Sequence, residues 1–470
     1  MNRIKYTGFA LLALCMASFA EAKPEKPNLV FIIADDCTFR DIGCYGGQAY
    51  TPHIDALAKE GMQMMHCFQT AAMCSPTRHT IYTGLYPVKS GAYPNHTFVR
   101  DEVKSVVHYL EPLGYRVALS GKTHISPKEN FPFEYSKAKG KGSNPDMEVI
   151  DQLMTESIAD GNPFCLFACS NEPHTPWNLG DASRYPPEEV KLPPYILDTP
   201  RTRSDFSNYL AEVTYFDWQV GEILGLLDKH GIADNTLVIV VSEQGNAFPF
   251  AKWTCYDNGL QAAMIARWPG KIEAGSVSEA FVEYVDVTPT FLDAAGGKKA
   301  AGLDGRSMLP VLEGKKSSHK KYVYGLQTTR GINHGSPHYG IRSVRGERYK
   351  LIHNLDPNAR FQNAATNMPL YKEWVAAAAA GDTKAKHLVE RYENRPEFEF
   401  YDTAKDPLEM NNLYGNSEHE EIVKKLKKEL ASWMKDQGDL GQETELAAYD
   451  RMKNGAERKA NIEKQNAAKN

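Results

Sequence analysis

Apolar and polar residues occur in blocks along this chain, and the blocks predict strands separated by helices. A continuous apolar run over residues 28–34 ends in two adjacent carboxylates, Asp35 and Asp36. An uninterrupted run of this kind is typical of a parallel strand that is buried on both faces. Similar runs predict further buried strands over residues 116–120, 164–170, 236–242 and 262–268.

Amphipathic segments between these runs predict helices. Thr51 and Pro52 begin a short helix that ends near Gly61, because threonine caps a helix and proline suits its first turn. Strands that alternate with helices predict an α/β fold, a mostly parallel sheet covered by helices on both faces. The longer helical patterns cover residues 106–113, 147–159, 205–230 and 286–295.

The pattern changes after about Gly314. Segments 339–345 and 348–354 predict a hairpin around Gly346, segment 398–401 adds a strand, and segment 418–437 is an amphipathic helix. We therefore expect a smaller antiparallel α+β subdomain at the C-terminal end. The expected organisation is a signal peptide over 1–22, a catalytic domain over 23–320, the subdomain over 321–437, and a polar tail over 438–470, loosely helical or disordered.

The composition argues against one class of function. The chain has 470 residues, 42% of them hydrophobic, which is enough to bury a large core. The net charge is −5, with both signs mixed along the chain and no basic stripe. Nucleic-acid binding is therefore not expected.

The N-terminus predicts export. Arg3 and Lys5 precede an apolar stretch over residues 9–19, and Ala20-Glu21-Ala22 fits a signal-peptidase site. The stretch is short for a membrane span, and no other segment is long enough, although a short N-terminal anchor is the alternative. We expect a secreted or periplasmic protein without stable membrane insertion.

The cysteines do not define a disulfide framework. The chain has 8 cysteines, and Cys15 would be lost with the signal peptide. The odd number that remains leaves at least one cysteine unpaired, and the spacing shows no pairing. Since no Cys-x-x-Cys occurs, a zinc ribbon is not expected.

The strongest chemical signal is the segment Cys74-Ser75-Pro76-Thr77-Arg78, followed after four residues by Thr83-Gly84. It resembles the Cys-x-Pro-x-Arg signature of the formylglycine-dependent sulfatases, a family of the alkaline phosphatase superfamily. The resemblance implies that Cys74 is oxidised to formylglycine by a formylglycine-generating or an anaerobic sulfatase-maturating enzyme. Taken alone, a cysteine at the start of a helix is usually a buried free thiol.

The chemistry of sulfuryl transfer explains why an aldehyde suits this position better than a thiol. A thiol would form a stable thiosulfate-like adduct. A hydrated aldehyde has two hydroxyls: one attacks sulfur, and the other then loses its proton, expels sulfate and regenerates the aldehyde. Arg78 lies one helical turn after Cys74 and can stabilise a developing alkoxide.

The adjacent carboxylates Asp35 and Asp36 repel each other unless a cation lies between them, although alone they could be a solvated strand end. The resemblance implies that they bind a divalent metal together with residue 74 and two residues after the strand at 236–242. Those two residues are Glu243 and Gln244, where the family usually has Asp and Asn or His. An all-oxygen set suits Ca²⁺ or Mg²⁺, and Ca²⁺ tolerates irregular geometry better.

Three more segments, two of them directly after predicted strands and one in a loop, match motifs of the family. Lys122 and His124 follow a predicted strand, and the resemblance implies that Lys122 contacts sulfate while His124 orients the formylglycine hydrate. His174 matches the substrate-side histidine that protonates the leaving oxygen, and Lys252 matches a second sulfate-binding cation. Taken alone, each would be an ordinary structural or surface residue.

The expected substrate is a terminal sugar that carries a sulfate ester or a sulfamate. Stretches 121–127, 243–249 and 342–354 are most similar to the heparan N-sulfatase (sulfamidase)-like members of the family, although related O-sulfatases could share them. Loops at the ends of parallel strands commonly carry the binding residues of such folds. The candidate substrate-binding residues are Tyr93, His96, Arg100, Trp177, His334, His338, Arg342 and Arg345.

Two other functions are compatible with the same motifs. A phosphonate or phosphate-ester hydrolase can share the fold and the nucleophile. An inactive protein that binds sulfated glycans is the second alternative, but the complete set of cations and carboxylates argues against it.

Overall fold

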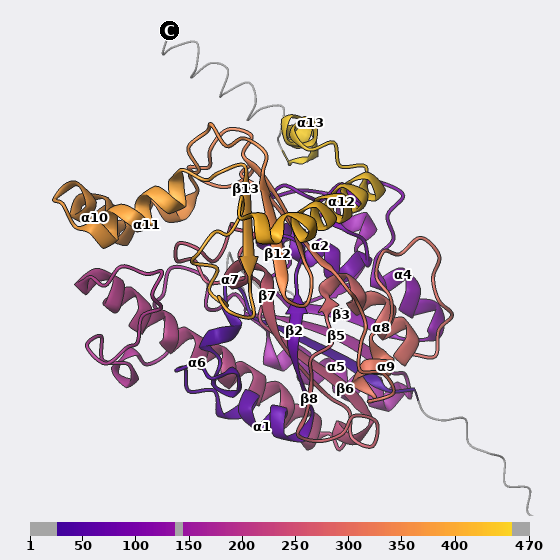
Figure 1. Ribbon diagram of the computed structural model, residues 1–470. Helices are drawn as coiled ribbons and strands as arrows, with labels where there is room; N and C mark the ends of the chain where they lie inside the picture. The colour runs from indigo at the N-terminus through magenta and orange to yellow at the C-terminus, as the bar shows by residue number, and fades with distance from the viewer. Residues whose placement is uncertain (1–25, 137–143, 454–470) are drawn as a thin grey trace, which may run out of the picture.

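The computed structural model describes residues 26–136 and 144–453, so the predicted signal peptide lies outside the described residues. The described residues form two sheets (Figure 1). The larger sheet has nine strands, in the order β4-β3-β5-β1-β6-β7-β2-β8, with β9 also paired to β2. The strands are β1 (Asn28–Ile33), β2 (Met62–Phe68), β3 (Arg116–Gly121), β4 (Glu134–Tyr135), β5 (Phe164–Cys169), β6 (Thr236–Val241), β7 (Gln261–Arg267), β8 (Ser276–Ser278) and β9 (Val282–Glu283).

The centre of this sheet is parallel, as the apolar runs predicted. Strands β4, β3, β5, β1 and β6 are parallel neighbours. Strand β7 runs antiparallel to both β6 and β2, so the sheet is mixed beyond β6. The prediction missed β2, because its sequence Met-Gln-Met-Met-His-Cys-Phe lacks a clear period and is only partly buried.

Helices cover both faces of the sheet. Alternate residues of β1 point to opposite faces, so both faces of this apolar strand need a covering layer. Val30 and Ile32 pack on one side, and Leu29, Phe31 and Ile33 pack on the other. The first side is covered by α1 (Pro52–Glu60), α5 (Met147–Asp160) and α6 (Pro200–Lys229). The second side is covered by α2 (Cys74–Thr83), α4 (Val106–Leu110), α8 (Val287–Ala294) and α9 (Leu309–Leu312).

The smaller sheet is antiparallel and forms the predicted C-terminal subdomain. Its order is β10 (Val323–Thr328), β11 (Gly340–Arg345), β12 (Tyr349–Asn354) and β13 (Phe398–Asp402). Helix α12 (Glu420–Gln437) lies across it, and Leu426, Leu430 and Trp433 join the same apolar cluster as the strand residues Leu351 and Phe400. The hairpin around Gly346 and the amphipathic helix are therefore confirmed.

Several helices of the described residues were not predicted from the sequence. Helices α10 (Pro369–Ala379) and α11 (Thr383–Glu393) project to the left of the two sheets in Figure 1. Trp374 of α10 is fully buried and donates to Thr202 of α6, which anchors the projection to the larger domain. The short helices α3 (Pro87–Ser90), α7 (Asp257–Leu260) and α9 were not predicted either.

Residues 438–453 of the expected polar tail are helical in part and packed against the rest of the protein. This segment forms α13 (Gln442–Leu446) and a 3₁₀ turn over Ala447–Arg451, and Glu445, Ala448 and Tyr449 are buried. It folds back because the carboxylate of Glu445 pairs with the buried guanidinium of Arg342 at 2.9 Å. The remainder of the predicted tail lies outside the described residues.

None of the helices in the described ranges is long and apolar enough to cross a bilayer.

Candidate active site

The predicted nucleophile begins a helix in the interior of the molecule. Cys74 is the first residue of α2 and only 4% exposed, and every residue of this helix is buried. The Cys74 Sγ lies 3.2 Å from the Asp35 Oδ1. Burial raises the pKa of the Cys74 thiol to about 12.

The four predicted oxygen ligands converge on Cys74 because β1 and β6 are parallel neighbours whose carboxyl ends meet at one sheet edge. One ligand atom from each of Asp35, Asp36, Cys74 and Glu243 lies within 4.8 Å of the others, and all four residues are buried. The Gln244 Nε2 donates to the Asp36 Oδ1 at 2.5 Å and also reaches the Cys74 Sγ at 3.2 Å. The structure therefore brings together every residue of the predicted metal set.

The chemistry of these side chains fits a hard divalent cation. The Glu243 Oε2 and the Gln244 Oε1 are buried and have no hydrogen-bond donor. A buried oxygen without a donor is costly, and a cation satisfies it. The sulfur of Cys74 stands where formylglycine would present an oxygen, so the complete donor set would contain only oxygen, as Ca²⁺ and Mg²⁺ prefer.

Three cations surround the carboxylates. The Arg78 Nε lies 2.8 Å from the Glu243 Oε1, with both side chains fully buried. Lys122 forms an ion pair with Asp35, and the Lys252 Nζ lies 2.5 Å from the Asp36 Oδ1. Burial lowers the pKa of Lys122 to about 7, and the nearby Lys252 contributes in the same direction.

Each of the two predicted histidines has one ring nitrogen occupied. The His174 Nδ1 lies 2.7 Å from the Thr175 carbonyl, which leaves its Nε2 3.7 Å from the Asp36 Oδ2. The His124 Nε2 lies 3.0 Å from the His96 Nδ1, and its own Nδ1 is buried without a hydrogen-bond partner. Burial lowers the pKa of His174 to about 4, and burial also lowers the pKa of His124.

Backbone strain concentrates around this site. Asp36, His96, His124 and Trp253 have φ values of 61°, 55°, 47° and 66°, in the left-handed region that residues other than glycine rarely adopt. Such residues persist where the surrounding structure holds them, and they gather at functional sites. The Asp36 Oδ1 lies 3.9 Å from the Cys74 Sγ.

Two predicted substrate-binding residues lie near the nucleophile. Trp177 stacks on Phe248 at 4.9 Å and packs against a small apolar cluster that includes Met73 and Trp253. His96 contacts His124, as described above. Residues 364–368 of the C-terminal subdomain reach the same cluster, which no sequence pattern had indicated.

Three further predicted substrate-binding residues are buried and are bound by other parts of the protein. Arg342 is fully buried between Asp439 and Glu445. Arg345 pairs with Asp257 at 2.9 Å, and the Tyr93 hydroxyl donates to the Thr444 carbonyl at 2.9 Å. The sequence shows the charge and the size of these side chains, but it does not show which groups of the protein will bind them.

The other three predicted substrate-binding residues have protein partners in the structure. Exposed His334 lies 3.1 Å from the amide nitrogen of Asn367. The His338 Nδ1 lies 3.2 Å from the Glu445 carbonyl, and exposed Arg100 donates to the Lys89 carbonyl at 3.2 Å. Their role in substrate binding stays a prediction.

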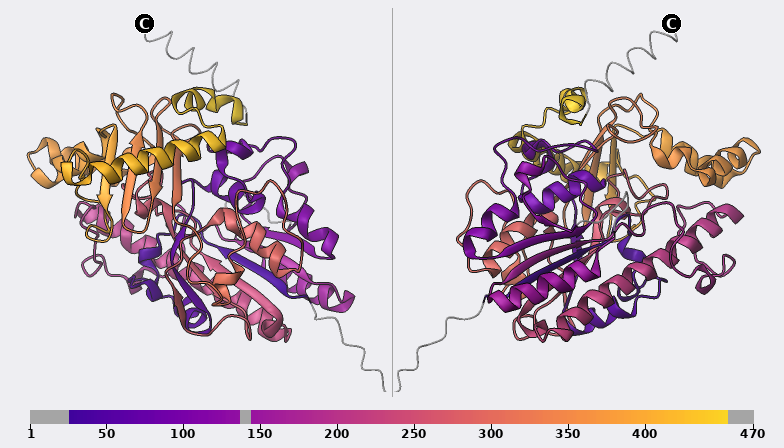
Figure 2. Two further views of the ribbon diagram at one scale, coloured as in Figure 1. Left: turned by 45° about the vertical axis from the view of Figure 1, so that its right-hand side comes forward. Right: turned by 180° about the vertical axis from the view of Figure 1, so that it is seen from behind.

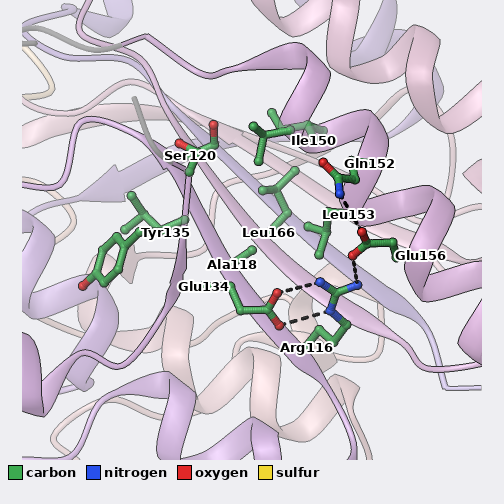
Figure 3. A pocket seen from close by; sticks show the side chains of 13 residues that line it. Arg116, Ala118, Ser120, Glu134, Tyr135, Ile150, Gln152, Leu153, Glu156 and Leu166 are labelled. Atoms are coloured by element: carbon green, nitrogen blue, oxygen red, sulfur yellow. Dashed lines mark hydrogen bonds and ion pairs between the residues drawn. The ribbon is translucent and has the colours of Figure 1, made fainter. Parts of the chain in front are cut away.

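A separate cavity of about 180 Å³ lies at the outer edge of the larger sheet. Figure 3 shows Arg116 there, held by Glu134 on one side and by Glu156 on the other. Arg116 begins β3, whereas Lys122 follows the opposite end of that strand. The cavity is therefore distinct from the cluster around Cys74.

Comparison with known proteins agrees with this geometry. The sulfatase family model matches residues 27–297, and a model described as N-sulphoglucosamine sulphohydrolase, C-terminal, matches residues 245–363 and 371–436. An ulvan-active sulfatase of Formosa agariphila is 34% identical over 432 residues, covering 90% of this chain and 83% of its own. The N-sulphoglucosamine sulphohydrolase of Homo sapiens is 28% identical over 469 residues, covering 89% of this chain and 92% of its own.

A solved structure shares the fold. The solved structure of BT4656 in complex with its substrate D-glucosamine-2-N,6-O-disulfate has a TM-score of 0.69 at 21% identity, covering 89% of this chain and 99% of that one. The family model spans more than half of the chain, and its range contains the cysteine, the carboxylates and the lysines described above. The protein therefore belongs to the sulfatase family and is a sulfuric ester hydrolase.

Proposed function

We propose that this sulfatase removes sulfate, as an ester or a sulfamate, from the terminal sugar of a sulfated glycan. The observation that carries the proposal is the convergence on Cys74 of a carboxylate cluster and of two lysines whose partners are those carboxylates. When a metal binds the carboxylates, the two lysines lose these partners. Their ammonium groups can then bind an anionic group of the substrate.

The nucleophile in this proposal is Cys74 after oxidation to formylglycine by a maturation enzyme. Its position at the N-terminus of α2 favours the negative charge that develops on an attacking oxygen. Arg78 lies one turn along the same helix and adds a fixed positive charge. The His124 Nδ1 is the ring nitrogen left to accept the proton of the second hydroxyl when sulfate leaves.

Substrate sulfate is held by lysine and released with the help of histidine. Lys122 and Lys252 approach the cluster from different loops and can each contact a sulfate oxygen. With both ring nitrogens protonated, His174 donates from Nδ1 to the Thr175 carbonyl and gives its Nε2 proton to the leaving oxygen or nitrogen of the sugar. The sugar then departs in its protonated form.

A divalent cation completes the proposed site. Asp35, Asp36, Glu243, Gln244 and residue 74 would hold it, and we propose Ca²⁺ because the glutamate and glutamine arms make an irregular oxygen cage. When bound, the cation polarises the sulfuryl group and lowers the pKa of the attacking hydroxyl. Arg78 remains beside Glu243 and fixes that carboxylate.

Two kinds of sugar are the leading substrates. The second family model is described by the N-sulphoglucosamine reaction, which supports N-sulfoglucosamine. The relative with 34% identity is described as ulvan-active, which supports an O-sulfated polysaccharide fragment. Both reactions use the same nucleophile, so the choice depends on residues that contact the sugar, such as Trp177.

The test is a substrate panel with matured enzyme. N-sulfoglucosamine, 6-O-sulfated N-acetylglucosamine, 3-O- and 6-O-sulfated galactose, and ulvan fragments would be compared by sulfate release. A matched aryl sulfate and aryl phosphate would show whether the enzyme prefers sulfuryl transfer. Equal release from internal positions of long polymers would contradict the terminal-sugar proposal, and faster phosphate release would contradict the sulfatase mechanism.

We further propose that the protein is exported. The basic residues Arg3 and Lys5, the apolar stretch after them and the Ala20-Glu21-Ala22 site support this. N-terminal sequencing of the protein from its native host should begin at residue 23. An intact N-terminus in a membrane fraction would instead support the anchor.

A further inference from the structure

The exposed residue His96 contacts one of the two ring nitrogens of His124. The His96 Nδ1 lies 3.0 Å from the His124 Nε2, and the two ring centres are 4.8 Å apart. A neutral imidazole has one donor and one acceptor nitrogen, so a partner on one nitrogen determines the role of the other. With its Nε2 at His96, His124 has only Nδ1 left, and this atom is buried without a partner.

His96 belongs to a loop, residues 91–98, that the C-terminal end of the chain fastens at several points. The Arg451 guanidinium donates to the Gly91 carbonyl at 3.0 Å and to the Phe98 carbonyl at 2.9 Å, so one side chain joins both ends of the loop. The Thr97 hydroxyl donates to the Arg451 carbonyl at 2.6 Å. The Lys453 amide donates directly to the His96 carbonyl at 3.1 Å.

The C-terminal segment 438–453 is itself anchored to the smaller sheet. Arg342 of β11 holds both Asp439 and Glu445, and all three side chains are buried. The Arg330 guanidinium lies over the ring of Tyr449 at 4.3 Å and donates to its hydroxyl. Both views of Figure 2 show the yellow C-terminal segment beside the purple region that follows α2.

We propose that His96 is a positioning residue for His124 and that residues 438–453 hold His96 in place. The proposal rests on the proposed function, in which His124 accepts a proton from the formylglycine hydrate. If His96 accepts from the His124 Nε2–H, the His124 Nδ1 keeps the lone pair that this step requires. The part of the chain that the sequence suggested was a loose tail thus supports the reaction.

The first test replaces His96 without straining the backbone. His96 has a φ of 55°, which glycine and asparagine both tolerate. We expect His96→Gly to lower kcat on the order of 10- to 100-fold with little change in KM, because a misplaced catalytic group slows the chemical step. His96→Asn, whose amide can reach the position of Nδ1, should restore most of kcat.

The second test removes the contacts between Arg451 and the two ends of the loop 91–98. Arg451→Met loses both carbonyl contacts and should lower kcat several-fold, again at nearly constant KM. The matched control is Arg116→Met, which removes an ion-paired arginine at the opposite end of β3 (Figure 3). It should leave kcat unchanged, and thermal unfolding of each variant separates loss of fold from loss of positioning.

Combination with His124→Ala distinguishes this proposal from the proposed function. In the His124→Ala background, His96→Gly should have no further effect on kcat, because the residue through which it acts is absent. Wild-type kcat in both His96→Gly and Arg451→Met, or a mainly raised KM, would overturn the proposal and make His96 a substrate contact or a bystander. Wild-type kcat in His124→Ala would instead overturn the role of His124 in the proposed function.

Discussion

At the scale of single residues, the charges around Cys74 are matched pair by pair. Arg78 pairs with Glu243, and Lys252 pairs with Asp36, in each case with both side chains buried. Removing one member of a buried pair leaves an uncompensated charge, which commonly costs about 3–5 kcal/mol. Test substitutions at these positions should therefore change the side-chain volume little and should retain the charge where possible.

Cys74→Ala is the mildest substitution that removes the proposed nucleophile. It should abolish turnover while the protein keeps its circular dichroism spectrum and unfolding temperature, because the thiol is a minor part of the packing. A tryptic mass spectrum of active wild-type enzyme should show formylglycine at residue 74. Active enzyme that contains only unmodified cysteine would refute the proposed nucleophile.

Glu243→Asp tests the metal ligands at constant charge. The shorter arm withdraws the carboxylate both from the cation site and from the Arg78 Nε, now 2.8 Å away. We expect Ca²⁺ affinity, measured by isothermal titration calorimetry, to fall on the order of ten-fold or more. Glu279→Asp, at a mostly exposed glutamate, is the control, and unchanged affinity in Glu243→Asp would remove Glu243 from the ligand set.

At the scale of elements, buried carboxylates join helix starts to distant segments. Asp286 precedes α8, where its carboxylate accepts from the Arg306 amide at 2.9 Å and pairs with Lys320 at 3.0 Å. Its other oxygen accepts from the Glu283 amide and lies 3.1 Å from the His319 Nε2. This one side chain therefore ties α8 to the chain segment that leads into the smaller sheet.

The pH dependence of stability should reveal this junction. Burial alone would raise the pKa of Asp286, but Lys320 and His319 bring it from 3.8 down to about 2. A lowered pKa stabilises the fold at neutral pH by about 2 kcal/mol, and this contribution disappears as the pH falls from about 4 to about 2. Urea unfolding of Asp286→Asn should show lower stability at pH 7 and a weaker dependence in that window; a dependence equal to that of the wild type would contradict the assignment.

At the scale of the whole molecule, the active site lies where separate parts of the chain meet. Leu326 of β10 donates its amide to the Thr70 carbonyl, shortly before Cys74. Ala365 of the C-terminal subdomain packs in the cluster that contains Met73. Lys453 reaches the loop of His96. Stability and activity should therefore change together when this meeting point is disturbed.

Metal removal is such a disturbance. Exhaustive chelation should abolish activity and lower the unfolding temperature, because the folded state then loses the free energy of metal binding. Added Ca²⁺ should restore both, and at a hundred times its Kd it contributes about 2.7 kcal/mol. Asp36→Asn should lose the Ca²⁺-dependent rise in unfolding temperature; full activity at zero measured metal would contradict the metal proposal.

The sequence by itself determined the features that depend on local pattern. Apolar runs without interruption specified the central strands, and the residues after them, Asp35, Lys122, His174 and Glu243, were predicted correctly to lie together. The physical reason is that parallel strands bring their carboxyl ends to one edge, so position along the chain predicts position in space. The signature around Cys74 added the proposed nucleophile.

Only the tertiary structure decided which charged groups pair with one another. Arg342 and Arg345 look like ligands for an anion in the sequence, yet Asp439 and Asp257 neutralise them in the interior. The segment after residue 437 is polar in composition but becomes ordered because Glu445 meets Arg342. A side chain's partner depends on which distant segment folds against it, and no local period records that choice.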